Sequence, residues 1–196
     1  RLLVLLACGM LAACAGVAPA PPEIHVALPP PAAVPTSATA SFGVWRIAPY
    51  GAAGPYRERA MVYSEDDGRS LQQHPYQYWV DSPPRLCRDA LMVALREAGL
   101  ASRVVATADP GAAFEVRGRV IAFDRLMSAA GSSAHLALEL EVVDTGSREV
   151  RLSRRYEERQ PAVDNDAVGT AAAAAAALDA IHRRFVADAL QALRAR

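Results

Sequence analysis

Apolar and polar residues alternate along three segments in the second half of the chain, and this period of two predicts β-strands with one buried face. The segments are residues 114–123, 135–143 and 150–156. In the first of them the polar positions are Glu115, Arg117 and Arg119. Strands of this kind commonly pair antiparallel and leave their polar face in water. We therefore expect an antiparallel sheet that is covered on one side.

Shorter apolar segments predict further strands in the first half of the chain. They are residues 42–47, 59–64, 71–80 and 103–106, with a short edge strand at 24–28. Glu65-Asp66-Asp67-Gly68 separates segments 59–64 and 71–80, and Asp-Gly is a strong signal for a hairpin turn. The glycine-rich stretch 51–55 is expected to be a turn.

Two segments repeat their apolar residues at helical spacing. The first follows Ser82, a suitable N-cap, and ends at Gly99; Arg85 and Asp89 are one turn apart on its polar face. The second runs from about 166 to 194, with an apolar stripe at Leu178, Ile181, Phe185, Ala189 and Leu193. Together the elements predict an α+β fold: a largely antiparallel sheet of about five to six strands with two helices packed on one face.

The N-terminal segment predicts a lipoprotein signal. Arg1 precedes about ten apolar residues, and Leu11-Ala12-Ala13-Cys14 has the leucine, two small residues and cysteine of a lipobox. The apolar run is shorter than the roughly 20 residues that a spanning helix needs. We expect cleavage before Cys14 and acylation of its thiol; the alternative is an ordinary secretory signal in which Cys14 occurs by chance. Ala15, in place of an aspartate, favours the periplasmic face of the outer membrane.

Proline composition divides the remaining chain. Seven of the fourteen prolines lie between residues 15 and 40, at Pro19, Pro21, Pro22, Pro29, Pro30, Pro31 and Pro35. Such a segment favours extended conformations and buries little apolar surface. The predicted organisation is a signal peptide at 1–13, a lipidated cysteine and Pro/Ala-rich tether at 14–40, and a single α+β domain at 41–196.

Charge and cysteine content exclude several classes of function. The chain has 21 basic and 21 acidic residues, so it lacks the basic excess typical of nucleic-acid binding. With Cys14 acylated and Cys8 in the signal, Cys87 is the one thiol left, and its place on a predicted helix indicates a small core residue.

Motifs that suggest catalysis or metal binding have simpler interpretations. Asp144-Thr145-Gly146 resembles the loop of aspartic proteases, but that chemistry needs two such carboxylates, and the tripeptide also suits a turn between strands. Asp164-Asn165-Asp166 suits a helix N-terminus better than a calcium loop. His25, His74, His135 and His182 lack metal-ligand spacing and are expected at the surface. We predict no catalytic residue, no metal and no cofactor.

The aromatic residues of segment 71–80 have two interpretations. Tyr76, Tyr78 and Trp79 form either a binding surface or a strand whose rings pack under the first helix. Core packing is favoured for Trp79, because large aromatic side chains dominate protein cores as well as interfaces.

The order of these features resembles a known family. The features are the lipobox, the proline-rich tether, the strand and helix start Tyr76-Gln77-Tyr78-Trp79-Val80-Asp81-Ser82-Pro83, the helix Leu86–Leu100, the strand Phe114–Phe123, the leucine-rich strand, the Asp144-Thr145-Gly146 turn and the alanine-rich final helix. Together they resemble the ABC-type transport auxiliary lipoproteins, the outer-membrane partners of MCE-domain lipid transport systems.

The resemblance implies a non-enzymatic docking protein. It would be held by its lipid in the inner leaflet of the outer membrane and would bind an MCE-domain protein. Assembly into a homo-oligomer is a further possibility. Cys14 is the residue that the resemblance assigns. By elimination, exposed strand edges and the face with Arg117 and Arg119 are the candidate docking surfaces. The alternatives are an assembly lipoprotein for lipopolysaccharide or a secretion channel, and a membrane-anchored hydrolase.

Overall fold

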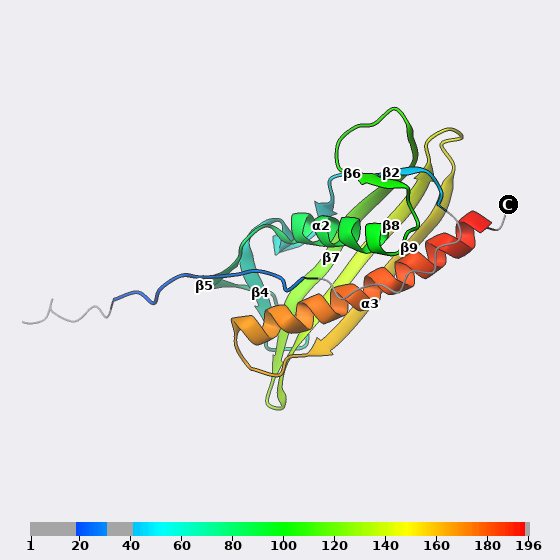
Figure 1. Ribbon diagram of the computed structural model, residues 1–196. Helices are drawn as coiled ribbons and strands as arrows, with labels where there is room; N and C mark the ends of the chain where they lie inside the picture. The colour runs from blue at the N-terminus through cyan, green and yellow to red at the C-terminus, as the bar shows by residue number, and fades with distance from the viewer. Residues whose placement is uncertain (1–18, 31–40, 195–196) are drawn as a thin grey trace, which may run out of the picture.

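The computed structural model describes residues 19–30 and 41–194. In this part of the chain a nine-stranded mixed sheet is covered on one face by two helices, α2 (Pro83–Glu97) and α3 (Ala167–Arg194) (Figure 1). The predicted α+β class and the two helices on one face are thus confirmed.

Three long strands form the centre and one edge of the sheet. They are β7 (Ala112–Ser128), β8 (Gly131–Asp144) and β9 (Val150–Pro161), and each pairs antiparallel with the next. Leu136, Leu138 and Leu140 of β8 are fully buried on the helix-covered face. The three strands predicted from alternation are therefore present, and each is longer than predicted.

Short strands line the other edge of β7. Strands β2 (Val44–Ile47), β3 (Gly51–Ala52) and β4 (Ala60–Ser64) all pair parallel with it. Strand β6 (Arg103–Val105) is parallel to β2, and β1 (Ile24–Val26) is parallel to β5 (Gln72–Trp79). The hairpin of β4 and β5 is antiparallel, as the Asp-Gly signal predicts.

The prediction of a largely antiparallel sheet of five to six strands is wrong. The sheet has nine strands, and five of its eight pairings in the described residues are parallel. Alternation of apolar and polar residues indicates that one face of a strand is buried, but it does not indicate whether the strand pairs parallel or antiparallel. Because β7 is 17 residues long, its edge accommodates three short strands in succession. The stretch 51–55, predicted as a turn, forms β3 and the start of a 3₁₀ helix, η2 (Gly54–Arg57).

The helices follow their predicted signals closely. Gly99, just after α2, has a φ of 65°, a conformation that favours glycine. The apolar stripe of α3 is buried along its whole length: Leu178, Ile181, Phe185, Ala189 and Leu193. Trp79 is 3% exposed and its ring meets Phe123 edge-on at 5.0 Å between centroids, so its core position is confirmed.

Strand β1 lies inside the segment that composition predicts as a tether, at the position expected for a short edge strand. Its Val26 is buried against the domain. Cys14 and residues 31–40 lie outside the described residues. No helix in the described ranges is long and apolar enough to cross a bilayer.

Candidate functional site: the charged face of β7, β8 and β9

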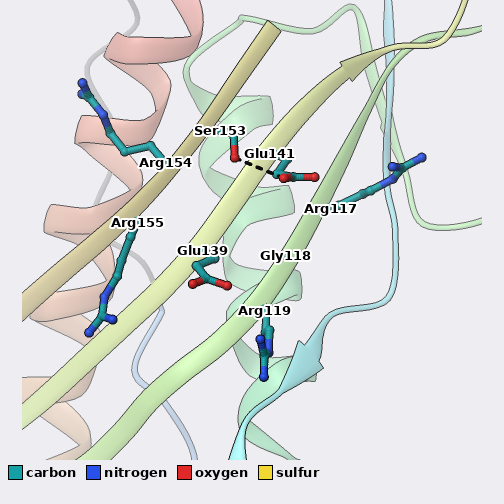
Figure 2. Close-up of a pocket in the computed structure, with 8 residues that line it drawn as sticks. All are labelled: Arg117, Gly118, Arg119, Glu139, Glu141, Ser153, Arg154 and Arg155. Carbon is teal, nitrogen blue, oxygen red and sulfur yellow. Dashed lines mark hydrogen bonds between the residues drawn. The ribbon is translucent and has the colours of Figure 1, made fainter. Parts of the chain in front are cut away.

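The three long strands present a charged face on the side of the sheet away from the helices. Because successive side chains alternate between faces, the polar positions of β7, β8 and β9 gather on this side. They border a shallow cavity of about 330 Å³, lined by Arg117, Gly118, Arg119, Glu139, Glu141, Ser153, Arg154 and Arg155 (Figure 2). We call this surface the charged face.

Strand register places opposite charges side by side on the charged face. Arg119 of β7 pairs with Glu139 of β8, which pairs with Arg155 of β9. Two residues before Arg119 on β7, Arg117 pairs with Glu141 of β8. Opposite charges on directly paired positions attract each other, and this contributes modestly to sheet stability. The surface therefore carries both signs of charge in a fixed pattern.

Several of these charges have hydrogen-bond partners. Arg117 Nε donates to Glu115 Oε1 at 2.8 Å, and Arg46 of β2 also bonds to Glu115. These contacts lower the pKa of Glu115, and the hydrogen bond from Arg117 has the largest effect. Ser153 Oγ donates to Glu141 Oε1 at 3.1 Å.

Other charges of the face remain exposed to solvent. Arg119 and Glu139 are exposed and make no hydrogen bond or ion pair within the described residues. Arg154 borders the cavity, but its guanidinium points toward α3, where Nη1 donates to Asp188 Oδ2 at 2.7 Å. The free charges of Arg119 and Glu139 are thus available to a partner.

A polar network continues the same face toward the end of β7. Asp124 Oδ1 accepts from the Tyr56 hydroxyl at 2.9 Å, and its Oδ2 lies 3.3 Å from His135 Nδ1. His135 Nε2 lies 2.9 Å from Glu157 Oε1. The hydrogen bond with Asp124, followed by that with Glu157, raises the pKa of His135 above its ordinary value, against the effect of burial. The network joins η2, β7, β8 and β9.

Sequence reasoning found part of this surface. Arg117 and Arg119 were the predicted candidates, and the structure places both on the charged face. Asp124 and Tyr56 were missed, because the alternation of 114–123 ends before Asp124 and Tyr56 follows a glycine-rich stretch. The sequence signal that could have identified Asp124 is its position, because it is an acidic residue directly after the apolar end of a predicted strand.

The other predicted positions have structural roles. Cys87 is fully buried and unpaired in α2, where burial raises the pKa of its thiol, so its interpretation as a core residue is confirmed. Asp144 ends β8, and its Oδ1 accepts from the backbone N–H groups of Gly146 and Ser147, which makes the motif a turn. Asp166 Oδ1 accepts from the Gly169 N–H at 2.7 Å at the start of α3, as expected of a helix N-terminus.

The histidines differ from their predicted surface positions. His182 of α3 is 1% exposed, and neither of its ring nitrogens has a hydrogen-bond partner among residues 19–30 and 41–194. This burial lowers the pKa of His182 to about 3. His135 is mostly buried in the network with Asp124 and Glu157. The prediction of surface histidines is therefore wrong for these two, because helical or strand periodicity does not exclude a polar ring from a buried position. Within the described ranges, no three histidine, cysteine or acidic residues lie close enough together to hold a metal ion.

Fold and surface define a class: a small α+β domain with one face covered by helices and one charged face left open. The family model for the ABC-type transport auxiliary lipoprotein component matches residues 27–186, and the chain belongs to this family.

Solved structures share the fold at low sequence identity. Protein XCC0632 from Xanthomonas campestris is 17% identical with a TM-score of 0.75; the match covers 87% of this chain and 96% of that one. An uncharacterized protein is 12% identical with a TM-score of 0.60, covering 89% and 98%. The hypothetical protein CT253 from Chlamydia trachomatis is 10% identical with a TM-score of 0.50, covering 79% and 99%. No curated protein matches the chain.

Proposed function

We propose that this protein is a docking lipoprotein of an ABC-type lipid transport system, anchored at the periplasmic face of the outer membrane, and that its partner is the MCE-domain protein of that system. Membership of the transport auxiliary family supports the class of function. The observation that carries the docking role is the charged face, where the exposed Arg119 and Glu139 lie on paired positions of an open sheet.

The pattern of charge on this face suits recognition of one partner in one orientation. Charged groups at an interface contribute mainly to specificity and to the rate of association, because like charges placed together in a wrong orientation are costly. An acidic group on the MCE-domain protein would meet Arg119, and a basic group would meet Glu139. Strands fix the spacing of these two side chains better than a loop would.

The anchor is the second part of the proposal. Acylation of Cys14 would hold the domain at the bilayer, because each buried methylene of an acyl chain contributes about 0.8 kcal/mol to membrane binding. The segment from 15 to 40 would then separate the domain from the membrane surface. A tether of this kind keeps the domain close to the membrane, where it would meet the MCE-domain protein. It thereby raises the effective concentration of the domain for binding that partner.

The proposal includes a non-enzymatic role. The pair that comes nearest to catalytic chemistry is Asp124 with His135, and in covalent hydrolases such a pair activates the hydroxyl or thiol of a third residue. In the structure as described, the hydrogen-bond partners of this pair are Tyr56 and Glu157. Neither supplies a serine hydroxyl or a thiol, which supports docking over hydrolysis.

Affinity capture tests this function directly. A tagged full chain is recovered from detergent-solubilised membranes, and the proteins that copurify are identified by mass spectrometry. Arg119→Glu reverses one charge of the charged face, and Arg183→Glu reverses an exposed arginine of α3 as the control. We expect the wild type and R183E to recover an MCE-domain protein and R119E to recover about tenfold less, which corresponds to about 1.4 kcal/mol.

Recovery of only a porin-like or secretin partner would reject the transport function in favour of an assembly lipoprotein. Equal loss in R119E and R183E would reject the charged face as the docking surface, with the partner still identified.

A further inference from the structure

A second cavity lies between β4, β5 and β7, away from the charged face. It has a volume of about 200 Å³. Met61 and Tyr63 of β4, Met127 of β7 and His74 of β5 form much of its wall, and Arg125 of β7 also lines it. The lining is mixed: apolar side chains form part of the wall, and Gln77, His74, Glu65 and Arg125 add polar and charged groups.

Arg125 carries a buried charge that has no ion-pair partner within the described residues. The residue is 9% exposed, and among the residues that the structure describes its side chain makes one hydrogen bond, from Nη2 to the amide oxygen of Asn165 at 2.5 Å. Its Nε is shielded from solvent and has no acceptor in the described part of the chain. In the described residues no carboxylate lies within ion-pair distance of the guanidinium; Asp166 acts on it only from farther away.

This arrangement is unusual for an arginine. Buried charges in proteins are normally paired, and a guanidinium stays charged because its pKa lies far above neutral. Arg46 of the same sheet follows this rule through its ion pair with Glu115. Burial lowers the pKa of Arg125 without removing its charge. An anion in the cavity would provide the missing partner.

His74 offers a second donor at the cavity. The backbone N–H of Tyr76 donates to His74 Nδ1 at 3.2 Å, so the neutral ring carries its proton on Nε2. Glu65 also borders the cavity, but it is exposed and its charge is screened by water.

We propose that this cavity binds a phosphate group, with the guanidinium of Arg125 as its counter-ion and His74 as a further donor. The planar fork of an arginine suits phosphate oxygens, and the apolar walls of Met61, Tyr63 and Met127 suit an apolar body attached to that phosphate. The phosphate could belong to a lipid headgroup or be free. This site needs neither the anchor nor the MCE-domain partner of the proposed function, so the two proposals fail separately.

Isothermal titration calorimetry on the full chain in a neutral detergent tests the site. The probes are inorganic phosphate and dihexanoyl phosphatidate, a soluble short-chain phospholipid. The variants are Arg125→Met, which has a similar length without charge, Arg125→Lys, which keeps the charge without the fork, and Arg183→Gln, at an exposed arginine of α3, as the control. Urea unfolding in phosphate-free buffer shows whether each variant is folded.

We expect the wild type and R183Q to bind phosphatidate and R125M to bind it at least about tenfold more weakly, with R125K between them. R125M should unfold at a urea concentration no lower than the wild type, because the substitution removes a buried charge that has no ion-pair partner in the described residues. Phosphatidate bound much more tightly than inorganic phosphate identifies a lipid headgroup, and equal affinities identify free phosphate. Absence of binding to the wild type, or wild-type affinity in both R125M and R125K, overturns the proposal.

Discussion

His135 joins three strands through two carboxylates. Protonation of its ring is therefore expected to make the stability of the fold depend on pH. Its ring lies between Asp124 of β7 and Glu157 of β9, with Asp124 held from the other side by the Tyr56 hydroxyl. The charged form of His135 is favoured by both neighbours, because each carboxylate attracts the second proton of the imidazole.

The pH dependence of stability follows from this contact. The pKa of His135 is raised above 6.5 in the folded protein, so its stabilisation is complete below pH 6.5 and is lost as the pH rises through the raised value. The pKa of Glu157 is lowered below 4.5, first by its hydrogen bond with His135, so its own contribution is present above pH 4.5 and is lost in more acidic solution. The pair therefore stabilises the domain most between these two values.

Urea unfolding of the wild type and of His135→Gln across this range measures the effect. We expect the difference in unfolding free energy to be largest at about pH 5.5 and to shrink as the solution becomes alkaline, by up to about 3 kcal/mol. A difference that does not change with pH would show that His135 is neutral throughout and contributes only by packing.

At the scale of single elements, α3 begins at an unusually close contact. A Cβ placed on Gly169 would lie 2.2 Å from the backbone oxygen of Asp164. Alanine is normally the better helix former by about 1 kcal/mol, yet here we expect Gly169→Ala to destabilise the protein by about 1 to 3 kcal/mol through overpacking.

The matched control is Ala176→Gly on the exposed side of the same helix, which should lower stability by about 1 kcal/mol through propensity alone. Thermal unfolding of both variants tests the contact. A higher unfolding temperature for G169A than for the wild type would mean that helix propensity decides at this position and that the contact relaxes without strain.

Elements with a strong local signal were predictable from the sequence, and long-range pairings were not. The alternation of β8, the Asp-Gly hairpin and Gly99 after α2 each depend on neighbouring residues, so a sequence pattern identifies them. The parallel pairing of β2 with β7 joins segments about seventy residues apart, and nothing in the local pattern of either segment reports it. Arg125 was missed for the same reason, because its burial depends on β4 and β5.

In the whole molecule, one face of the sheet forms the core and the other face is exposed to solvent. Helices α2 and α3 and the leucines of β8 form the core on one side, which leaves the charged face of β7, β8 and β9 open on the other. A stable domain with one open face can present a fixed pattern of charge without a change of fold. Its position in the cell then depends on the proposed anchor.

Cys14→Ser tests the anchor. We expect the variant to leave the membrane fraction and to appear in the soluble periplasmic fraction as a folded protein, because the substitution removes the proposed site of acylation and lies outside the domain. Fractionation of whole cells, followed by circular dichroism of the released protein, measures both properties. A variant that stays with the membranes would indicate that another part of the protein holds it there.

Site-specific photo-cross-linking in cells tests the central claim, that the charged face contacts an MCE-domain protein. A photoreactive amino acid at Glu139 is compared with one at Glu97, an exposed residue at the end of α2. We predict an adduct with the MCE-domain protein from position 139 and none from position 97. An adduct with that protein from position 97 alone, or an adduct from position 139 to an unrelated outer-membrane protein, would contradict the account.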